Sequence, residues 1–228
     1  MYGFKLLDLI AFGFFLVSWL GYHLMVESLP FGQRSLNLRM NFRRARWIEQ
    51  SIRRENRIFD AQILNALQQG TAFFASTSLI AIGGSLALLQ STEKLLDLFH
   101  DLPIAEVPTK LVWEMKVIGF AVIFAYAFFK FAWAYRLFNY LAILLGALPK
   151  VPEADQPHAR NAVREATALA ISAGKHFNRG QRAFFFAIAY LGWFMGALVF
   201  LISTAAVLLV MAHRQFLSEA AMAISDDA

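Results

Sequence analysis

The stretch ALQQGTAFFASTSLIAIGGSLALL, residues 66–89, decides the fold class because it carries no charged side chain. A helix needs about 20 mostly apolar residues to cross the ~30 Å hydrocarbon core of a bilayer. The rest of the chain agrees with a membrane setting. Of its 228 residues, 58% are hydrophobic and 16% are charged, against about 45–50% and about 25% in a typical soluble domain. The sequence therefore predicts an all-α membrane protein.

Three further apolar runs complete a prediction of four transmembrane helices in a single integral membrane domain, residues 1–228. The predicted spans are residues 6–25, 66–89, 112–138 and 183–211, and the third run is longer than a bilayer needs. All six prolines fall between the spans, as expected because proline disrupts a helix interior. The first span is interpreted as a retained helix, because Asp8 occupies the part of a signal peptide that is normally basic.

The loops between these spans differ in charge. Residues 27–65 hold eight arginines and residues 149–182 hold six basic residues, whereas residues 90–110 hold two lysines against four acidic residues. The positive-inside rule places basic loops in the cytoplasm. With four spans, both termini and the acidic loop then lie outside. For a bacterium this predicts the inner membrane, with both termini in the periplasm.

Each basic loop contains a predicted cytoplasmic amphipathic helix. Residues 38–64 carry apolar side chains at three- and four-residue steps, the spacing of a helix face. Residues 157–178 begin with a proline, which suits a first turn, and Asn178 or Gly180 is the predicted terminator. These two helices add to the four transmembrane helices of the predicted fold class.

The first of these helices is strongly basic. Clustered arginines beside a membrane are attracted to anionic lipids, so lipid headgroups or the second cytoplasmic helix are the expected contacts of Arg43, Arg44, Arg53 and Arg54. The simplest alternative is that these arginines only set the orientation. Nucleic acid is not expected as a partner, because the two flanking spans hold the helix at the membrane.

Ionisable residues inside a span are costly and mark candidate sites. The candidate anion or headgroup site consists of polar residues near the inner ends of the first and third spans: His23, Lys130, Arg136 and Asn139. The alternative is that the long side chains only reach out to the interface. Near the outer ends of the same spans, Asp8 and Lys116 have a similar depth, so they can form a pair or be hydrated separately.

Small residues predict close helix packing. Gly192 and Gly196 form a GxxxG motif in the fourth span, and such spacing lets two helices approach closely within one chain or between subunits. We expect a homo-oligomer or a subunit of a larger membrane complex, with anionic membrane lipids as further partners.

No catalytic or metal site is predicted, and no cofactor is expected. The chain has no cysteine, which excludes disulfides and thiolate ligands. It also lacks the HExxH, phosphate-loop and GxSxG motifs. The favoured function is a non-enzymatic oligomeric or accessory subunit of a membrane assembly. An oligomeric channel or transporter that favours anions is the first alternative, and a lipid- or small-molecule-modifying membrane enzyme is the second.

Four stretches resemble the domain of unknown function 599 family of bacteria and plants. They are GYHLMVESLPFGQRSLNLRMNFRRARWIEQSI, ILNALQQGTAFFASTSLIAIGGSLALL, KVIGFAVIFAYAFFKFAWAYRLFNYLAILLGALP and NRGQRAFFFAIAYLGWFMG, in this order along the chain. The resemblance implies a small multi-span membrane protein. It supplies no activity and no catalytic or ligand residues.

Overall fold

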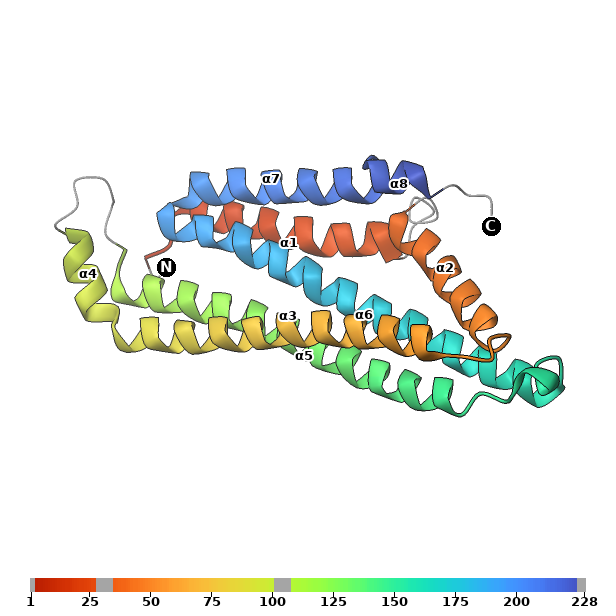
Figure 1. The fold of residues 1–228 in the computed structure, drawn as a ribbon. Helices are drawn as coiled ribbons and strands as arrows, with labels where there is room; N and C mark the ends of the chain where they lie inside the picture. The colour runs from red at the N-terminus through yellow and green to blue at the C-terminus, as the bar shows by residue number, and fades with distance from the viewer. Residues whose placement is uncertain (1–2, 28–34, 101–107, 225–228) are drawn as a thin grey trace.

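The computed structural model describes residues 3–27, 35–100 and 108–224, which form helices joined by short connections (Figure 1). The elements are α1 (Leu6–Glu27), α2 (Leu36–Ser51), α3 (Ile58–Gln90), α4 (Thr92–His100), α5 (Lys110–Gly146), the short 3-10 helix η2 (Val151–Glu153), α6 (Pro157–Met195), α7 (Ala197–Phe216) and α8 (Glu219–Ala223). By length and composition, four stretches can cross a membrane: Leu6–Glu27, Ile58–Gln90, Lys110–Gly146 and Ala197–Ala223. The predicted fold class is confirmed.

The long helices fall into two length classes. Helices α1 and α7 have 22 and 20 residues, so they are roughly 30 Å long and match the hydrocarbon core of a bilayer. Helices α3, α5 and α6 have 33, 37 and 39 residues, which corresponds to roughly 50–58 Å. Figure 1 shows these three continuing beyond α1 toward α2. We call the part that contains α1 and α7 the membrane half, and the part where α2 packs on the long helices the basic half.

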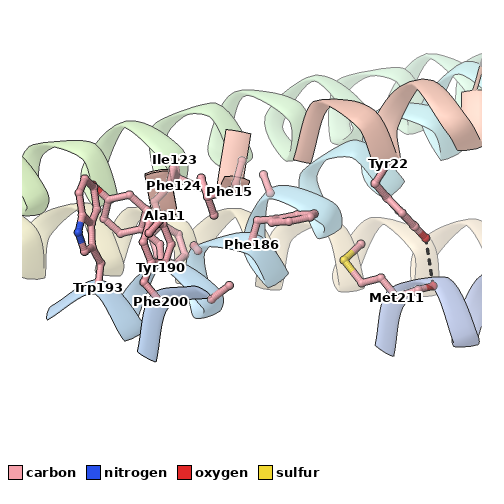
Figure 2. Close-up of a cluster of buried hydrophobic side chains, with 14 of the residues drawn as sticks. Ala11, Phe15, Tyr22, Ile123, Phe124, Phe186, Tyr190, Trp193, Phe200 and Met211 are labelled. Carbon is pink, nitrogen blue, oxygen red and sulfur yellow. Dashed lines mark hydrogen bonds between the residues drawn. The ribbon is translucent and has the colours of Figure 1, made fainter. Parts of the chain in front are cut away.

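Aromatic side chains fill the core of the membrane half (Figure 2). Phe15 of α1 packs against Phe186 of α6 and Phe200 of α7, with ring centroids 5.7 Å and 5.2 Å away. Such ring pairs contribute about 0.5–1.5 kcal/mol beyond the area that they bury. The Tyr22 hydroxyl donates a 3.1 Å hydrogen bond to the Met211 carbonyl oxygen. These contacts join α1, α7 and the C-terminal part of α6.

Smaller side chains form the core of the basic half. Ile48 of α2 and Leu141 of α5 are fully buried there, in one cluster with alanines of α6: Ala159, Ala166, Ala170 and Ala173. The Arg44 guanidinium lies directly on the backbone of α6, because a Cβ atom added at Gly174 would be 2.6 Å from the Arg44 Cζ. Burial lowers the pKa of Arg44. The small residues of α6 thus let α2 lie close against it.

The predicted fourth span, residues 183–211, is not a single helix. Helix α6 ends at Met195 and α7 begins at Ala197, because Gly196 has a φ of +131°. Glycine adopts this backbone conformation readily, whereas other residues rarely do. Helix α7 then returns alongside α6 (Figure 1). The apolar run continues through this turn, so hydropathy alone merges two antiparallel segments into one.

A buried ion pair supports the end of α6. The Lys116 ammonium donates a 2.9 Å hydrogen bond to the Trp193 carbonyl oxygen and lies 3.8 Å from the Asp8 carboxylate. The Trp193 indole N–H donates to the same carboxylate at 2.6 Å. Asp8 and Lys116 therefore do pair, and together they satisfy backbone and side-chain groups where α6 stops.

The two described ends of the chain lie at opposite ends of the bundle (Figure 1). Gly3 packs beside Thr109 and Val112 at the start of α5, whereas Arg39 of α2 donates a 2.9 Å hydrogen bond to the Ile224 carbonyl oxygen. This arrangement favours termini on opposite sides of the membrane over the predicted common side, and the cysteine labelling described in the Discussion tests which of the two holds. The turn at Gly196 adds one more passage of the chain along the membrane half, and this passage carries the C-terminal end to the basic half.

The boundaries of the two predicted cytoplasmic helices also differ from expectation. The segment 38–64 is divided, because α2 ends at Ser51 and α3 begins at Ile58. The Asn56 side chain accepts a 2.9 Å hydrogen bond from the Ile58 N–H, which forms an Asx turn of the kind typical of asparagine. The second helix does not end at Asn178 or Gly180 but continues within α6. A Cβ atom at Gly180 would be 2.7 Å from the Phe131 ring, so this glycine permits close packing of α5 on α6.

Candidate functional site

A charged cluster lies where α1 ends beside the middle of α6. The Glu27 carboxylate accepts hydrogen bonds of 3.1 Å and 3.0 Å from the Arg179 Nε, and another from the Arg182 guanidinium. Arg182 is only 5% exposed. The His23 Nδ1 is 3.2 Å from the same guanidinium and 3.4 Å from the Glu27 carboxylate. One turn of α1 and one turn of α6 thus hold four polar side chains together.

Positive charge predominates around the single carboxylate of this cluster. Lys130 of α5 and Arg179 lie close enough to act electrostatically on both His23 and His176. The Lys130 ammonium lies 5.1 Å from the centre of the Tyr126 ring, an arrangement that stabilises a cation. Glu27 can balance only one of the three full positive charges on Lys130, Arg179 and Arg182. The described residues of the cluster therefore carry more positive than negative charge.

A cavity of about 200 Å³ opens on the other side of Arg182, between α1, α2, α6 and α7. Arg214 of α7 is the second cation in its wall, and amide side chains supply further polar groups: Asn37, Asn178, Gln181 and Gln215. Among the described residues that line this cavity, none carries a carboxylate. The wall therefore offers positive charge and hydrogen-bond donors to whatever occupies the cavity.

The packing of α7 and α2 fixes the shape of the cavity. With its amide oxygen turned toward α2, Gln215 accepts hydrogen bonds from the Asn37 and Leu36 N–H groups at 2.9 Å and 3.3 Å. This contact holds the first turn of α2 against α7. The Arg214 guanidinium lies 5.3 Å from the centre of the Phe185 ring, which keeps the charge over α6. We call the cavity and the Glu27 cluster together the basic site.

The four residues of the predicted anion site divide into two groups. His23 and Lys130 belong to the basic site. Arg136 instead donates a 2.6 Å hydrogen bond to the Tyr140 hydroxyl on its own helix, and Asn139 accepts a 2.7 Å hydrogen bond from Gln68 of α3. The Arg136 contact lies within α5, and the Asn139 contact joins α5 to α3. Neither residue belongs to the basic site.

Sequence reasoning missed four residues of the basic site: Glu27, Arg179, Arg182 and Arg214. The signal was present in the arginines at 179 and 182, which stand one helical turn apart directly before an apolar run. The sequence prediction treats them as loop charges, because it ends the preceding helix at Asn178 or Gly180. Glu27 could not be assigned as their partner, because 152 residues separate it from Arg179.

The arginines of the first basic loop make contacts within the chain. Arg44 lies on α6, as described above, and Arg53 forms a 3.1 Å ion pair with Asp155, just before α6. Arg54 pairs with Asp60 of α3. For Arg43, the described part of the chain supplies no ion pair. Three of the four therefore contribute to the packing of α2.

The two glycines of the GxxxG motif have different roles. A Cβ atom at Gly192 would be 2.4 Å from the Ser203 Oγ and 3.0 Å from the Val199 carbonyl oxygen, so this glycine lets α7 pack closely on α6. Gly196 has no atom within 4 Å of such a Cβ position and forms the turn. The motif thus serves a helical hairpin within one chain.

Comparison with known protein families gives a match over residues 10–220, nearly the whole chain, to the family described as protein of unknown function, DUF599. The chain belongs to this family. The resemblance drawn from the sequence is confirmed, together with the architecture of a multi-span membrane protein. Comparisons with curated proteins and with solved structures gave no match. Membership of DUF599 therefore brings no activity, and an argument about function has to start from the basic site.

Proposed function

We propose that this DUF599 protein is a non-enzymatic membrane protein that binds the phosphate of an anionic lipid headgroup in the basic site. One observation carries the proposal. Arg182 and Arg214 come from different helices and line one cavity whose described wall has no carboxylate. Guanidinium groups suit this task, because their planar N–H donors match the oxygens of a phosphate.

The size of the cavity favours part of a ligand over a whole small molecule. Pockets for drug-sized ligands have volumes of about 300–1,000 Å³, whereas this cavity has about 200 Å³. A phosphate fits in that volume, and the remainder of the ligand then lies outside. A lipid meets this requirement, since its acyl chains extend along the apolar exposed faces of the neighbouring helices while its headgroup enters.

The position of the basic site supports the same ligand. It lies at the end of α1 and close to the end of α7, the two helices whose length matches the hydrocarbon core. Basic side chains at such a boundary are attracted to the anionic inner leaflet. The proposed orientation therefore has the basic half in the cytoplasm.

The proposal also includes a place in a membrane assembly, as a homo-oligomer or as an accessory subunit. Helix α3 supports it, because only 11% of its most apolar window is buried within the chain, and large side chains such as Phe73 and Ile80 are exposed. Transport through the single chain is not proposed, because the centre of the membrane half is packed with aromatic rings. Native mass measurement in nanodiscs reports the assembly, and a strict monomer without partners contradicts it.

Lipid preference in nanodiscs tests the headgroup site. Phosphatidylglycerol should stabilise the protein against heat more than phosphatidylcholine does, and Arg214→Gln should weaken the preference. We expect a loss of about 1 kcal/mol for one basic side chain, which is roughly fivefold in affinity. Arg46→Gln is the matched control, since Arg46 is an exposed arginine of α2 outside the cavity wall. An equal effect of both changes means that net charge alone sets the preference, and the proposed site is then wrong.

A further inference from the structure

A second cavity, of about 360 Å³, lies in the basic half between α3 and α5. It is larger than the cavity of the basic site, and the described residues that line the two cavities do not overlap. Most of its wall is apolar and comes from both helices: Ala61, Leu64, Ala142 and Leu145. Its volume falls within the range of about 300–1,000 Å³ that is typical of small-molecule pockets. This cavity is therefore large enough for a complete small ligand.

The polar side chains of this wall already use their hydrogen-bond donors within the chain. The Arg57 guanidinium donates to the Leu148 and Pro149 carbonyl oxygens at 2.8 Å and 2.5 Å, at the end of α5. The Ser51 hydroxyl donates to the Ile48 carbonyl oxygen at 2.7 Å. The Gln68 amide donates to Asn139 of α5, as described above. A ligand that needs a donor from this wall would compete with these contacts for the Arg57 and Gln68 N–H groups.

An acceptor remains in the same wall. Asp60 is 1% exposed, and its Oδ1 accepts hydrogen bonds from the Trp47 indole N–H at 2.7 Å and from the Arg54 guanidinium. Its other carboxylate oxygen, Oδ2, is buried without a hydrogen-bond partner in the described part of the chain. Buried polar groups are normally hydrogen-bonded. The group that this oxygen lacks is a donor. Because Oδ2 has almost no exposed surface, a donor in the cavity reaches it once the Asp60 side chain turns toward the cavity that it lines.

The charges around the cavity decide which donor fits. Arg54 neutralises Asp60, and Arg57 adds one more positive charge to the wall. An ammonium group would enter against this surplus charge, whereas a hydroxyl donates a hydrogen bond without carrying charge. We infer that the cavity between α3 and α5 binds a neutral amphipathic molecule, which donates a hydroxyl hydrogen bond to Asp60 and packs an apolar body against Leu64 and Leu145.

Photolabelling of the full chain in nanodiscs tests this site with a defined probe, 1-octanol that carries a diazirine. Ultraviolet light should attach the probe to residues 58–68 and 142–146, and excess unlabelled 1-octanol should compete. Gly146→Leu should reduce the labelling at least fivefold. Gly146 lines the cavity, and a Cβ atom added there meets nothing within 4 Å, so a larger side chain can be introduced at the cavity wall without a clash at Cβ. Persistent labelling of this variant overturns the proposal.

Two controls separate the hydroxyl contact from simple partitioning. Gly84→Leu also adds a side chain where a Cβ atom meets nothing within 4 Å, but in α3 away from the cavity wall, and it should leave the labelling unchanged. A diazirine-bearing octane should label the cavity less than the alcohol does. Asp60→Asn should abolish this advantage of the alcohol while the alkane still labels the apolar walls, which shows that the cavity persists. Equal labelling by alcohol and alkane in the wild-type chain means that Asp60 does not select a hydroxyl.

Discussion

In both halves of the molecule, a basic side chain donates a hydrogen bond to a carbonyl group at the end of a long helix. The surroundings of these two contacts differ. In the membrane half, Lys116 donates to the Trp193 carbonyl oxygen at the end of α6, and its side chain is 9% exposed. In the basic half, Arg57 donates to the Leu148 carbonyl oxygen at the end of α5, and it is only partly buried. Terminal carbonyl groups of a helix need partners. Water can reach the carbonyl groups beside the half-buried Arg57, whereas the Lys116 side chain is enclosed by protein groups that exclude water.

The cores differ for a related reason. In lipid, helices associate through packing rather than through removal of apolar surface from water. The membrane half accordingly relies on interlocked rings, such as the stacked pair Trp193 and Phe200 at 5.0 Å. The basic half extends beyond the helices of membrane length, and there burial of aliphatic side chains and alanines provides stability by the hydrophobic effect. This contrast yields predictions of decreasing size.

The largest expected effect is an all-or-none difference in cysteine labelling. It reports on which side of the membrane each end of the helix bundle lies. The chain has no cysteine, so single cysteines report accessibility. In intact cells, a membrane-impermeant maleimide should label Lys94→Cys on α4 but spare Gln50→Cys on α2 and Glu219→Cys on α8, all three of which replace exposed residues. Membrane disruption should expose all three. Labelling of Glu219→Cys without Gln50→Cys would contradict the common location of α2 and α8.

Removal of the buried cation should cause the next largest effect. Lys116→Met leaves the Trp193 carbonyl oxygen and the Asp8 carboxylate without their cationic partner. Breaking a buried ion pair costs about 3–5 kcal/mol, and we expect about 3 kcal/mol here, measured by unfolding in mild detergent. The double change Asp8→Asn with Lys116→Met should recover part of this loss, because no charge remains buried. Full additivity of the two changes would show that the pair is not coupled.

The matching change in the basic half should cost less. Arg57→Met removes donors from the end of α5, but water can reach the freed carbonyl groups there. Net contributions of such hydrogen bonds are about 0.5–1.5 kcal/mol, so we expect a loss of about 1 kcal/mol in the same unfolding assay. If Arg57→Met destabilises the protein as much as Lys116→Met does, the two ends do not differ in access to water.

Much of the membrane half could be predicted from sequence, because apolar runs report membrane helices directly. The predicted second span, residues 66–89, lies within α3. The predicted first and third spans, residues 6–25 and 112–138, lie within α1 and α5. The predicted fourth span, residues 183–211, is interrupted at Gly196, because hydropathy does not record a change of backbone direction. A glycine can also have any of several structural roles, which the sequence alone does not distinguish. Gly180 was interpreted as a helix end, yet it stays helical and admits the Phe131 ring.

The basic site was harder to predict, because its parts are brought together by the fold. His23 and Lys130 could be selected as ionisable residues near span ends, but Arg214 lies near the far end of the chain. Its approach to Arg182 depends on the return of α7 after Gly196. Without the turn at Gly196, the prediction leaves Arg214 out of the site and separates the C-terminal end from α2, which it contacts in the structure.

The last predicted effect, which is also about 1 kcal/mol, concerns the competition between Glu27 and an external anion within the basic site. Glu27 occupies N–H groups of Arg179 and Arg182 that a headgroup phosphate could otherwise bind. Glu27→Gln removes one negative charge from the site, so affinity for phosphatidylglycerol in nanodiscs should rise by about 1 kcal/mol per uncompensated basic side chain, roughly fivefold. Glu49→Gln makes the same change in charge at an exposed position of α2 outside this site, and it should raise the affinity less, most clearly at high salt, where exposed charges are screened. If Glu27→Gln lowers the affinity instead, the carboxylate positions the arginines for the lipid and does not compete with it.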